Sequence, residues 1–148
     1  MMAEQGVLLA GEESGGIAVG GHIPEFDAVW AGMFIWQWMA ESGKSLSQLY
    51  EEVTGITGAF AFERASVEMN RNKRNKIAEQ CSNGSFKNFG RFEVSSFEIY
   101  DGFKFFFNPD EWLLIRPSSN EPVMRFYAEA EHVETAQEII YSAMKALL

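Results

Sequence analysis

Residues 112–128 read WLLIRPSSNEPVMRFYA and consist of two apolar runs on either side of a polar segment. Short runs of apolar or alternating residues bounded by turn residues are typical of β-strands. Residues 112–115 and 124–128 therefore predict two strands, and residues 116–122 predict the loop that joins them. Pro117 and Pro122 brace this loop, because proline fixes its own φ at about −65° and favours extended geometry in the residue before it.

The loop carries the groups that a phosphate monoester requires. Arg116 offers a guanidinium that binds two oxygens at once, while Ser118, Ser119 and Asn120 add short-range polar groups beside the N–H groups of the turn. The alternative is an ordinary polar turn in which Arg116 forms a surface ion pair, since Ser, Asn and Pro are common in turns of every kind. The loop chemistry by itself leaves both interpretations open.

The periodicity of the remaining chain predicts an α+β protein with two parts, residues 1–57 and 58–148. The first part contains a buried strand at 6–10, a loop at 11–16, a helix at 25–42 with Glu25 and Asp27 in its first turn, and a second helix whose capping box is Ser45 and Gln48. The second part predicts an antiparallel sheet with helices on one face. Its strands are expected at 60–69, 91–99, 103–107, 111–115 and 124–130, its helices at 71–81 and 133–147, and a two-residue hairpin turn at Asp101-Gly102. The last helix is expected to bury Val133, Ala136, Ile140, Ala143 and Leu147.

The helix expected at 25–42 is apolar nearly all round, with Trp30, Phe34, Trp36 and Trp38 in its middle. Such a helix is expected to be buried on more than one side, so we expect residues 1 to about 55 to self-associate or to pack closely on the C-terminal domain. It is too short and too polar to span a bilayer. The chain offers no obvious partner for it, which favours a piece of a longer protein.

Composition excludes several classes of function. The formal net charge of −9 argues against a nucleic-acid surface, and the basic run Arg71–Lys76 is interpreted as a solvated helix face. The single cysteine, Cys81, allows no internal disulfide and favours a reducing compartment, so a cytoplasmic location is expected. The two histidines, His22 and His132, have no metal-ligand spacing. No signal peptide is evident at the start.

Two motifs resemble those of the α-D-phosphohexomutases, the phosphoglucomutase and phosphomannomutase family. Residues 116–122 (RPSSNEP) resemble the family's phosphate-binding loop, and residues 11–16 (GEESGG) resemble its sugar-binding signature. The resemblance implies that Glu12 and Ser14 contact sugar hydroxyls, and that Arg116, Ser118, Ser119 and Asn120 bind the non-transferred phosphate of a phosphohexose. It also implies a TATA-binding-protein-like fold for the second part, with no consequence for DNA binding.

The resemblance implies that catalysis in this family needs two elements that this sequence does not contain. A phosphoserine transfers the phosphoryl group and Mg²⁺ bound to an Asp-rich loop neutralises charge, but neither motif occurs here. We therefore expect no catalytic residue and no metal site in this chain, and no mutase activity without the missing N-terminal domains. The alternatives are a free-standing phosphosugar-binding or regulatory module, and an unrelated structural domain that has both motifs by chance.

The sequence departs from the family pattern at two points. Phe26 stands where the family has a basic residue that contacts substrate, so that role cannot be carried over. Ser119 and Asn120 replace the family's usual Gly-Thr or Asn-Thr pair. Asn tolerates positive φ, which makes this second change compatible with the same turn. Neither motif distinguishes gluco-, manno- and glucosamine-type sugars.

Overall fold

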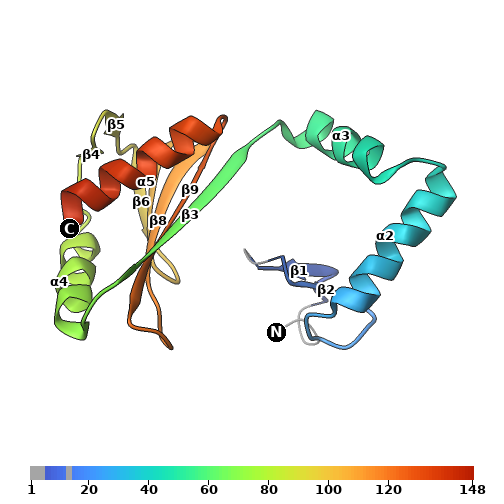
Figure 1. Ribbon diagram of the computed structural model, residues 1–148, viewed down its shortest axis with the longest axis horizontal. Coiled ribbons are helices and arrows are strands. Elements are labelled where there is room, and N and C mark those ends of the chain that lie inside the picture. The colour runs from blue at the N-terminus through green and yellow to red at the C-terminus, as the bar shows by residue number, and fades with distance from the viewer. Residues whose placement is uncertain (1–5, 13–14) are drawn as a thin grey trace. The chain divides into compact units, whose positions relative to one another are not determined.

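The computed structural model describes residues 6–12 and 15–148, and these fall into two compact units that meet between Gly58 and Ala59 (Figure 1). Each unit combines strands with helices. The predicted α+β class is confirmed. The two units are described separately below.

The first unit begins with a small antiparallel hairpin. Strands β1 (Leu9–Gly11) and β2 (Ile17–Val19) pair with Leu9 opposite Val19. The prediction of a buried strand at residues 6–10 is wrong in position and burial, because Leu8 and Leu9 are 82% and 65% exposed. The sequence analysis also missed β2, whose three residues are too few to show a period.

Helix α2 (Ala28–Ser42) begins one turn later than expected. Asp27 is its N-cap and accepts a 3.0 Å hydrogen bond from the backbone N–H of Trp30, so Glu25 and Asp27 precede the helix instead of forming its first turn. Gly43 ends the helix at φ 66°, a conformation that glycine adopts without strain. Within the described chain no residue of α2 is fully buried, contrary to the prediction. The physical reason is that, among the described residues, α2 packs mainly on the short strand β2, which covers little of its surface.

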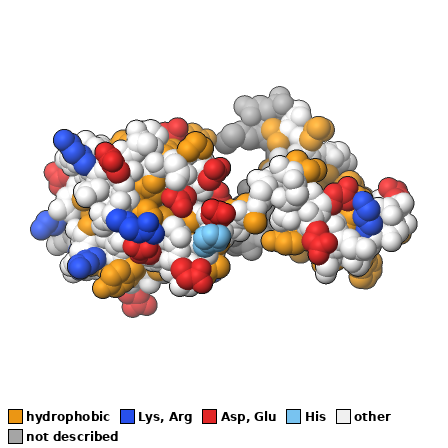
Figure 2. All heavy atoms as spheres, turned by 90° about the horizontal axis from the view of Figure 1, so that it is seen from above, with side chains coloured by type: hydrophobic (Ala, Val, Ile, Leu, Met, Phe, Trp, Pro, Cys, Tyr) orange, Lys and Arg blue, Asp and Glu red, His pale blue; other side chains and the backbone are white. Residues whose placement is uncertain are grey.

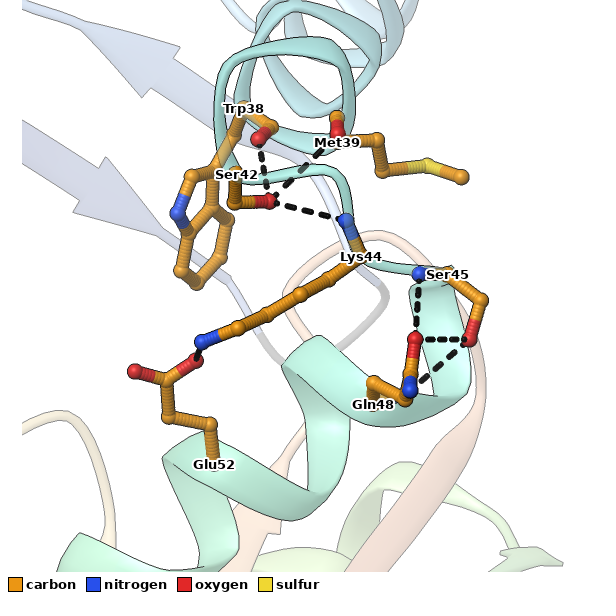
Figure 3. Close-up of polar contacts among 7 residues, drawn as sticks. All are labelled: Trp38, Met39, Ser42, Lys44, Ser45, Gln48 and Glu52. Carbon is orange, nitrogen blue, oxygen red and sulfur yellow. Dashed lines mark hydrogen bonds and ion pairs between the residues drawn. The ribbon is translucent and has the colours of Figure 1, made fainter.

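The turn after α2 is held by polar contacts (Figure 3). Ser45 and Gln48 form the predicted capping box at the start of α3 (Leu46–Thr57), each side chain bonding the other residue's backbone N–H. Lys44 Nζ lies 2.6 Å from Glu52 Oε2, one and a half turns into the helix. These local contacts explain why the second helix starts where the sequence predicts.

The second unit is built on a five-stranded antiparallel sheet with the order β3-β9-β8-β7-β6. The antiparallel prediction is confirmed. The elements in chain order are β3 (Ala61–Glu68), α4 (Arg71–Ser82), β4 (Asn88–Phe89), β5 (Phe92–Glu93), β6 (Ser96–Ile99), β7 (Phe103–Asn108), β8 (Glu111–Pro117), β9 (Val123–Ala130) and α5 (Val133–Leu147).

Both helices of this unit contribute to one hydrophobic core on a single face of the sheet (Figure 1). The core contains Ile77 and Cys81 of α4, Ala136, Ile139, Ile140, Ala143 and Leu147 of α5, and Phe105, Leu113, Ile115, Met124, Phe126, Ala128 and Ala130 of the strands. Val133 is 45% exposed, so its predicted burial is wrong, and Ile139 takes its place on the inner face of α5. Because successive side chains of a strand point to opposite faces, every second side chain lies on the sheet face opposite the helices.

The segment between α4 and β7 differs from the prediction of one strand at 91–99. It forms a small β4–β5 hairpin followed by the separate strand β6. The next turn contains three residues, 100–102, because Ile99 pairs with Phe103. Asp101 adopts φ 54° there and Gly102 adopts φ 140°, so the turn signal is correct although the loop is one residue longer.

Candidate phosphate-binding site

The candidate site lies where β8 passes into β9. Strand β8 runs to Pro117, so Arg116 belongs to the strand and not to the loop, which is a correction to the predicted seven-residue loop. Arg116 pairs across the strands with Arg125, and Pro117 pairs with Met124. The loop itself is the five residues 118–122. Extended geometry before and at Pro117 favours the longer strand.

Arg116 projects from the sheet face opposite helices α4 and α5. Its neighbour Ile115 is fully buried in the core, and successive side chains of a strand point to opposite faces. The side chain of Arg116 is 36% exposed, and its guanidinium lies 3.2 Å from Asp101 Oδ2 in the turn between β6 and β7. The structure therefore shows Arg116 in the surface ion pair that the alternative interpretation requires.

The backbone of residues 118–122 is closed by its own hydrogen bonds. Ser118 N–H donates to Val123 O at 3.0 Å, and Ser118 Oγ accepts from Glu121 N–H at 3.3 Å. Ser119 Oγ and Asn120 Oδ1 lie 3.2 Å apart, which brings the three predicted polar side chains together in one tight turn. Among the described residues, no protein acceptor takes a hydrogen bond from the backbone N–H of Ser119 or Asn120. These two exposed donors are suited to an anion.

The loop is also attached to a segment far away in the sequence. Arg74 of α4 donates through one terminal nitrogen to Ser118 O at 2.8 Å and to Glu121 O at 3.0 Å. Met69 N–H, just before α4, donates to Pro122 O at 2.9 Å. Arg74 lies in the run Arg71–Lys76, for which the sequence predicts a solvated helix face, so its contact with the loop was not expected. No signal in the sequence marks a contact between a side chain and a backbone carbonyl 44 residues away.

A second arginine lies beside Arg116. Arg125 forms an ion pair with Glu121 of the loop. Its hydrogen bond to Glu121 raises the pKa of Arg125 further above its usual range. Arg116 and Arg125 are cross-strand neighbours on the sheet face opposite α4 and α5.

The other predicted site residues lie in the first unit. In the loop between β1 and β2, Glu12 N–H donates to Gly16 O and Gly15 N–H donates to Glu12 O, both at 3.0 Å. A Cβ added at Gly16 would lie 2.7 Å from Glu12 Oε1 and 3.0 Å from Phe26 Cγ, so the carboxylate and the aromatic ring both lie against this glycine. Ser14 falls outside the described residues.

The described residues provide no cluster of three His, Cys, Asp or Glu side chains that is placed to hold a metal ion. They do not fit the magnesium site that the resemblance implies for a complete enzyme. No helix in the described ranges is long and apolar enough to cross a membrane. On the face shown in Figure 2, Lys and Arg side chains are interspersed with Asp and Glu.

The chain is similar to proteins of one family over nearly its whole length. Residues 1–55 match the family model described as phosphoglucomutase/phosphomannomutase, alpha/beta/alpha domain III, and residues 52–145 match the model of its C-terminal domain. A phosphoglucomutase/phosphomannomutase of Thermococcus kodakarensis is 28% identical over 99% of this chain. A probable phosphoglucosamine mutase of Thermococcus gammatolerans is 29% identical over 97% of it. The chain spans 30% of the length of each.

A solved structure supports the same fold. The crystal structure of a phosphoglucomutase/phosphomannomutase family protein from Burkholderia thailandensis aligns with a TM-score of 0.71 at 20% identity. The alignment covers 99% of this chain and 29% of that protein.

Proposed function

The chain belongs to the phosphoglucomutase/phosphomannomutase family, and on this basis we propose that it forms the substrate-binding portion of a phosphohexomutase. The substrate class is a hexose phosphate, such as a glucose or mannose phosphate. The observation that carries the proposal is the loop 118–122, in which the N–H groups of the exposed residues Ser119 and Asn120 follow Arg116 by three and four residues.

In the proposed complex, the non-transferred phosphate is bound by four residues, Arg116, Ser118, Ser119 and Asn120. The guanidinium donates two parallel bonds to phosphate oxygens, and the turn donates from its backbone N–H groups and hydroxyls. In the structure, the guanidinium of Arg116 forms an ion pair with Asp101 Oδ2 at 3.2 Å. A phosphate dianion carries more charge than this exposed carboxylate and therefore competes with it for the same donors.

Glu12 and Ser14 are proposed to contact the hydroxyls of the sugar ring. A carboxylate accepts from two adjacent hydroxyls, and a serine hydroxyl both donates and accepts. Phe26 lies against the same loop as an uncharged ring that is 52% exposed. We therefore assign no proton transfer to this position.

The proposed complete enzyme interconverts hexose 1-phosphate and hexose 6-phosphate. Binding of the phosphate that does not react orients the one that does, because remote binding energy is spent on positioning. Phosphoserine and Mg²⁺ belong to N-terminal domains in this proposal, and this chain supplies only binding. A coupled assay with glucose 1-phosphate, glucose 1,6-bisphosphate and Mg²⁺ is expected to show no turnover by this chain above the rate without protein.

The binding proposal is tested by titrating the chain with glucose 6-phosphate and with glucose. Binding of the phosphate ester alone is expected, and Arg116→Ala is expected to weaken it about ten- to a hundredfold, because one charge-assisted hydrogen bond contributes about 1.5–3 kcal/mol. Ser118→Ala removes a neutral hydroxyl and is expected to cost about 1 kcal/mol. Arg91→Ala is the matched control, since Arg91 also pairs with a carboxylate, Glu138, but lies outside the loop.

Equal affinity for glucose and glucose 6-phosphate, or an unchanged affinity in Arg116→Ala, would show that residues 116–122 form only a structural turn. Equal losses in Arg116→Ala and Arg91→Ala would attribute the effect to net charge and would also contradict the proposal.

The surface of α2 and the cysteine content suggest the partners and the location. The exposed apolar side chains of α2 favour self-association or a cover from the missing domains. The single cysteine, Cys81, is consistent with a cytoplasmic enzyme.

A further inference from the structure

We propose that Arg74 is a positioning residue of the phosphate-binding loop: by holding the carbonyl of Ser118, it aims the N–H of Ser119 at the bound phosphate. This inference rests on the proposed function of the loop. Arg74 lies on helix α4 and is not part of the motif that suggested the site. Its role is to orient a donor, without contact to the phosphate.

The side chain of Arg74 contacts carbonyl groups near both ends of the loop. One terminal nitrogen of Arg74 donates to Ser118 O at 2.8 Å and to Glu121 O at 3.0 Å, so a single group fixes the first carbonyl of the loop and the fourth. Within the described chain, the Nε atom of Arg74 is buried and has no hydrogen-bond partner. Leaving a buried donor unpaired costs free energy, and here the two loop carbonyls offset that cost.

The orientation of Ser119 N–H follows from the geometry of the peptide bond. The described chain contains no cis peptide bond, so the C=O of Ser118 and the N–H of Ser119 point in opposite directions from one planar unit. With Ser118 O drawn toward Arg74, the N–H of Ser119 points away from it. Helix α4 covers the core face of the sheet, and Arg116 projects from the other face. The N–H is thus directed to the side that carries the guanidinium of Arg116.

Hydrogen bonds fix the start of helix α4, which carries Arg74. Helix α4 starts at the N-cap Asn70, whose side chain accepts from Lys73 N–H at 2.9 Å, and Arg74 N–H donates to Asn70 O at 3.1 Å. Met69 N–H, one residue earlier, holds Pro122 O at 2.9 Å. The start of α4 and the end of the loop are therefore joined by backbone and side chain together, and Arg74 is placed one turn into the helix.

The test uses the full 148-residue chain, with inorganic phosphate and glucose 6-phosphate as probes and amide chemical shifts as the readout. Arg74→Met keeps an unbranched apolar side chain in place of the arginine stem and removes the guanidinium donors. It is expected to weaken phosphate binding about fivefold to tenfold and to abolish most of the phosphate-induced shift of the Ser119 amide. Arg71→Met removes the same charge from the same helix without a loop contact, and is expected to keep the affinity within about twofold.

Arg74→Lys separates position from charge. Its ammonium retains the charge but lacks the planar fork, so an intermediate affinity is expected together with a displaced Ser119 resonance in the free protein. This variant also decides the question if Arg74→Met does not fold. An unchanged Ser119 resonance and an unchanged affinity in Arg74→Lys would overturn the inference in that case.

The outcomes distinguish this inference from the function on which it rests. If the unsubstituted chain shows no saturable phosphate shift at Ser119 and Asn120, the proposed function itself is wrong. If that chain binds phosphate and Arg74→Met binds it equally well with the same Ser119 shift, only the role of Arg74 is wrong. Equal losses of phosphate affinity in Arg71→Met and Arg74→Met would attribute the effect to the net charge of the helix and would overturn the positioning role.

Discussion

Arg116 and Arg125 are direct cross-strand partners on β8 and β9, and a different carboxylate neutralises each of them. Asp101 pairs with Arg116 from the turn between β6 and β7, and Glu121 pairs with Arg125 from the loop before β9. Like charges directly opposite each other on a sheet are destabilising, so the two carboxylates stabilise this arrangement. An anion that enters the site competes with them for the same guanidinium groups.

Removing the charge of Asp101, which competes with phosphate for Arg116, is therefore expected to strengthen phosphate binding. Asp101→Asn keeps the shape of the side chain, and Asn tolerates the φ of 54° at this position. An exposed ion pair contributes about 0.2–1 kcal/mol, so calorimetry with glucose 6-phosphate is expected to show an affinity increase of up to about fivefold. Asp110→Asn removes the same charge from the turn between β7 and β8 and serves as the control. Weaker binding by Asp101→Asn would instead mean that Asp101 holds Arg116 in its binding position.

Substitution of Gly102 is expected to destabilise the sheet beside Arg116. Gly102 adopts φ 140°, and an added Cβ would lie 2.9 Å from Leu114 Cδ1 and 3.0 Å from the backbone oxygen of Ile115. Gly102→Ala is expected to lower the free energy of unfolding of the second unit by about 1–3 kcal/mol, measured by urea denaturation. An unchanged urea midpoint in Gly102→Ala would show that the turn accommodates the methyl group.

Cys81 is expected to be unreactive in the folded protein. Its side chain is fully buried, and burial raises the pKa of the thiol to about 12 from the usual 9.0. Iodoacetamide at pH 8 is expected to label the chain only after denaturant is added, since the thiolate is the reactive species. Rapid labelling of the native chain, read by mass spectrometry, would show that α4 opens readily.

The same shift predicts a dependence of stability on alkaline pH. Between pH 9 and 12 the unfolded chain loses the thiol proton while the folded chain keeps it, so the free energy of unfolding falls as pH rises, by up to about 1.4 kcal/mol per pH unit. The contribution is fully present below pH 9. Cys81→Ala is expected to remove this part of the slope, and an identical slope in both proteins would contradict the burial of the thiol.

Helix α2 is expected to mediate self-association. Trp36 is 73% exposed and Phe34 is 55% exposed in the described chain. Burying one such side chain contributes about 1.5–3 kcal/mol, so light scattering is expected to show a mass above 16.7 kDa that rises with concentration. Trp36→Ser is expected to lower this mass, whereas Tyr141→Ser, at a position 67% exposed on α5, is the control. A monomer with solvent-exposed tryptophan fluorescence at all concentrations would rule the association out.

Local patterns in the sequence were sufficient for most elements of the second unit. Alternation predicted β3 and β9, helical spacing predicted α4 and α5, and the prolines placed the loop before β9. The capping box at Ser45 and Gln48 was predicted for the same reason, because each of these signals depends on residues within one or two turns of the chain. The phosphate-loop motif was likewise readable as a contiguous segment.

Only the tertiary structure decided which groups act on that loop. The pairing of Arg116 with Arg125 extended β8 by two residues, and the Asp101 contact came from another turn. Arg74 meets Ser118 across 44 residues because α4 packs on the sheet, and a charged residue on a helix has the same sequence pattern whether it faces solvent or a neighbouring loop. Side-chain burial on α2 and α5 depended in the same way on the surfaces available to pack on, which no local period encodes.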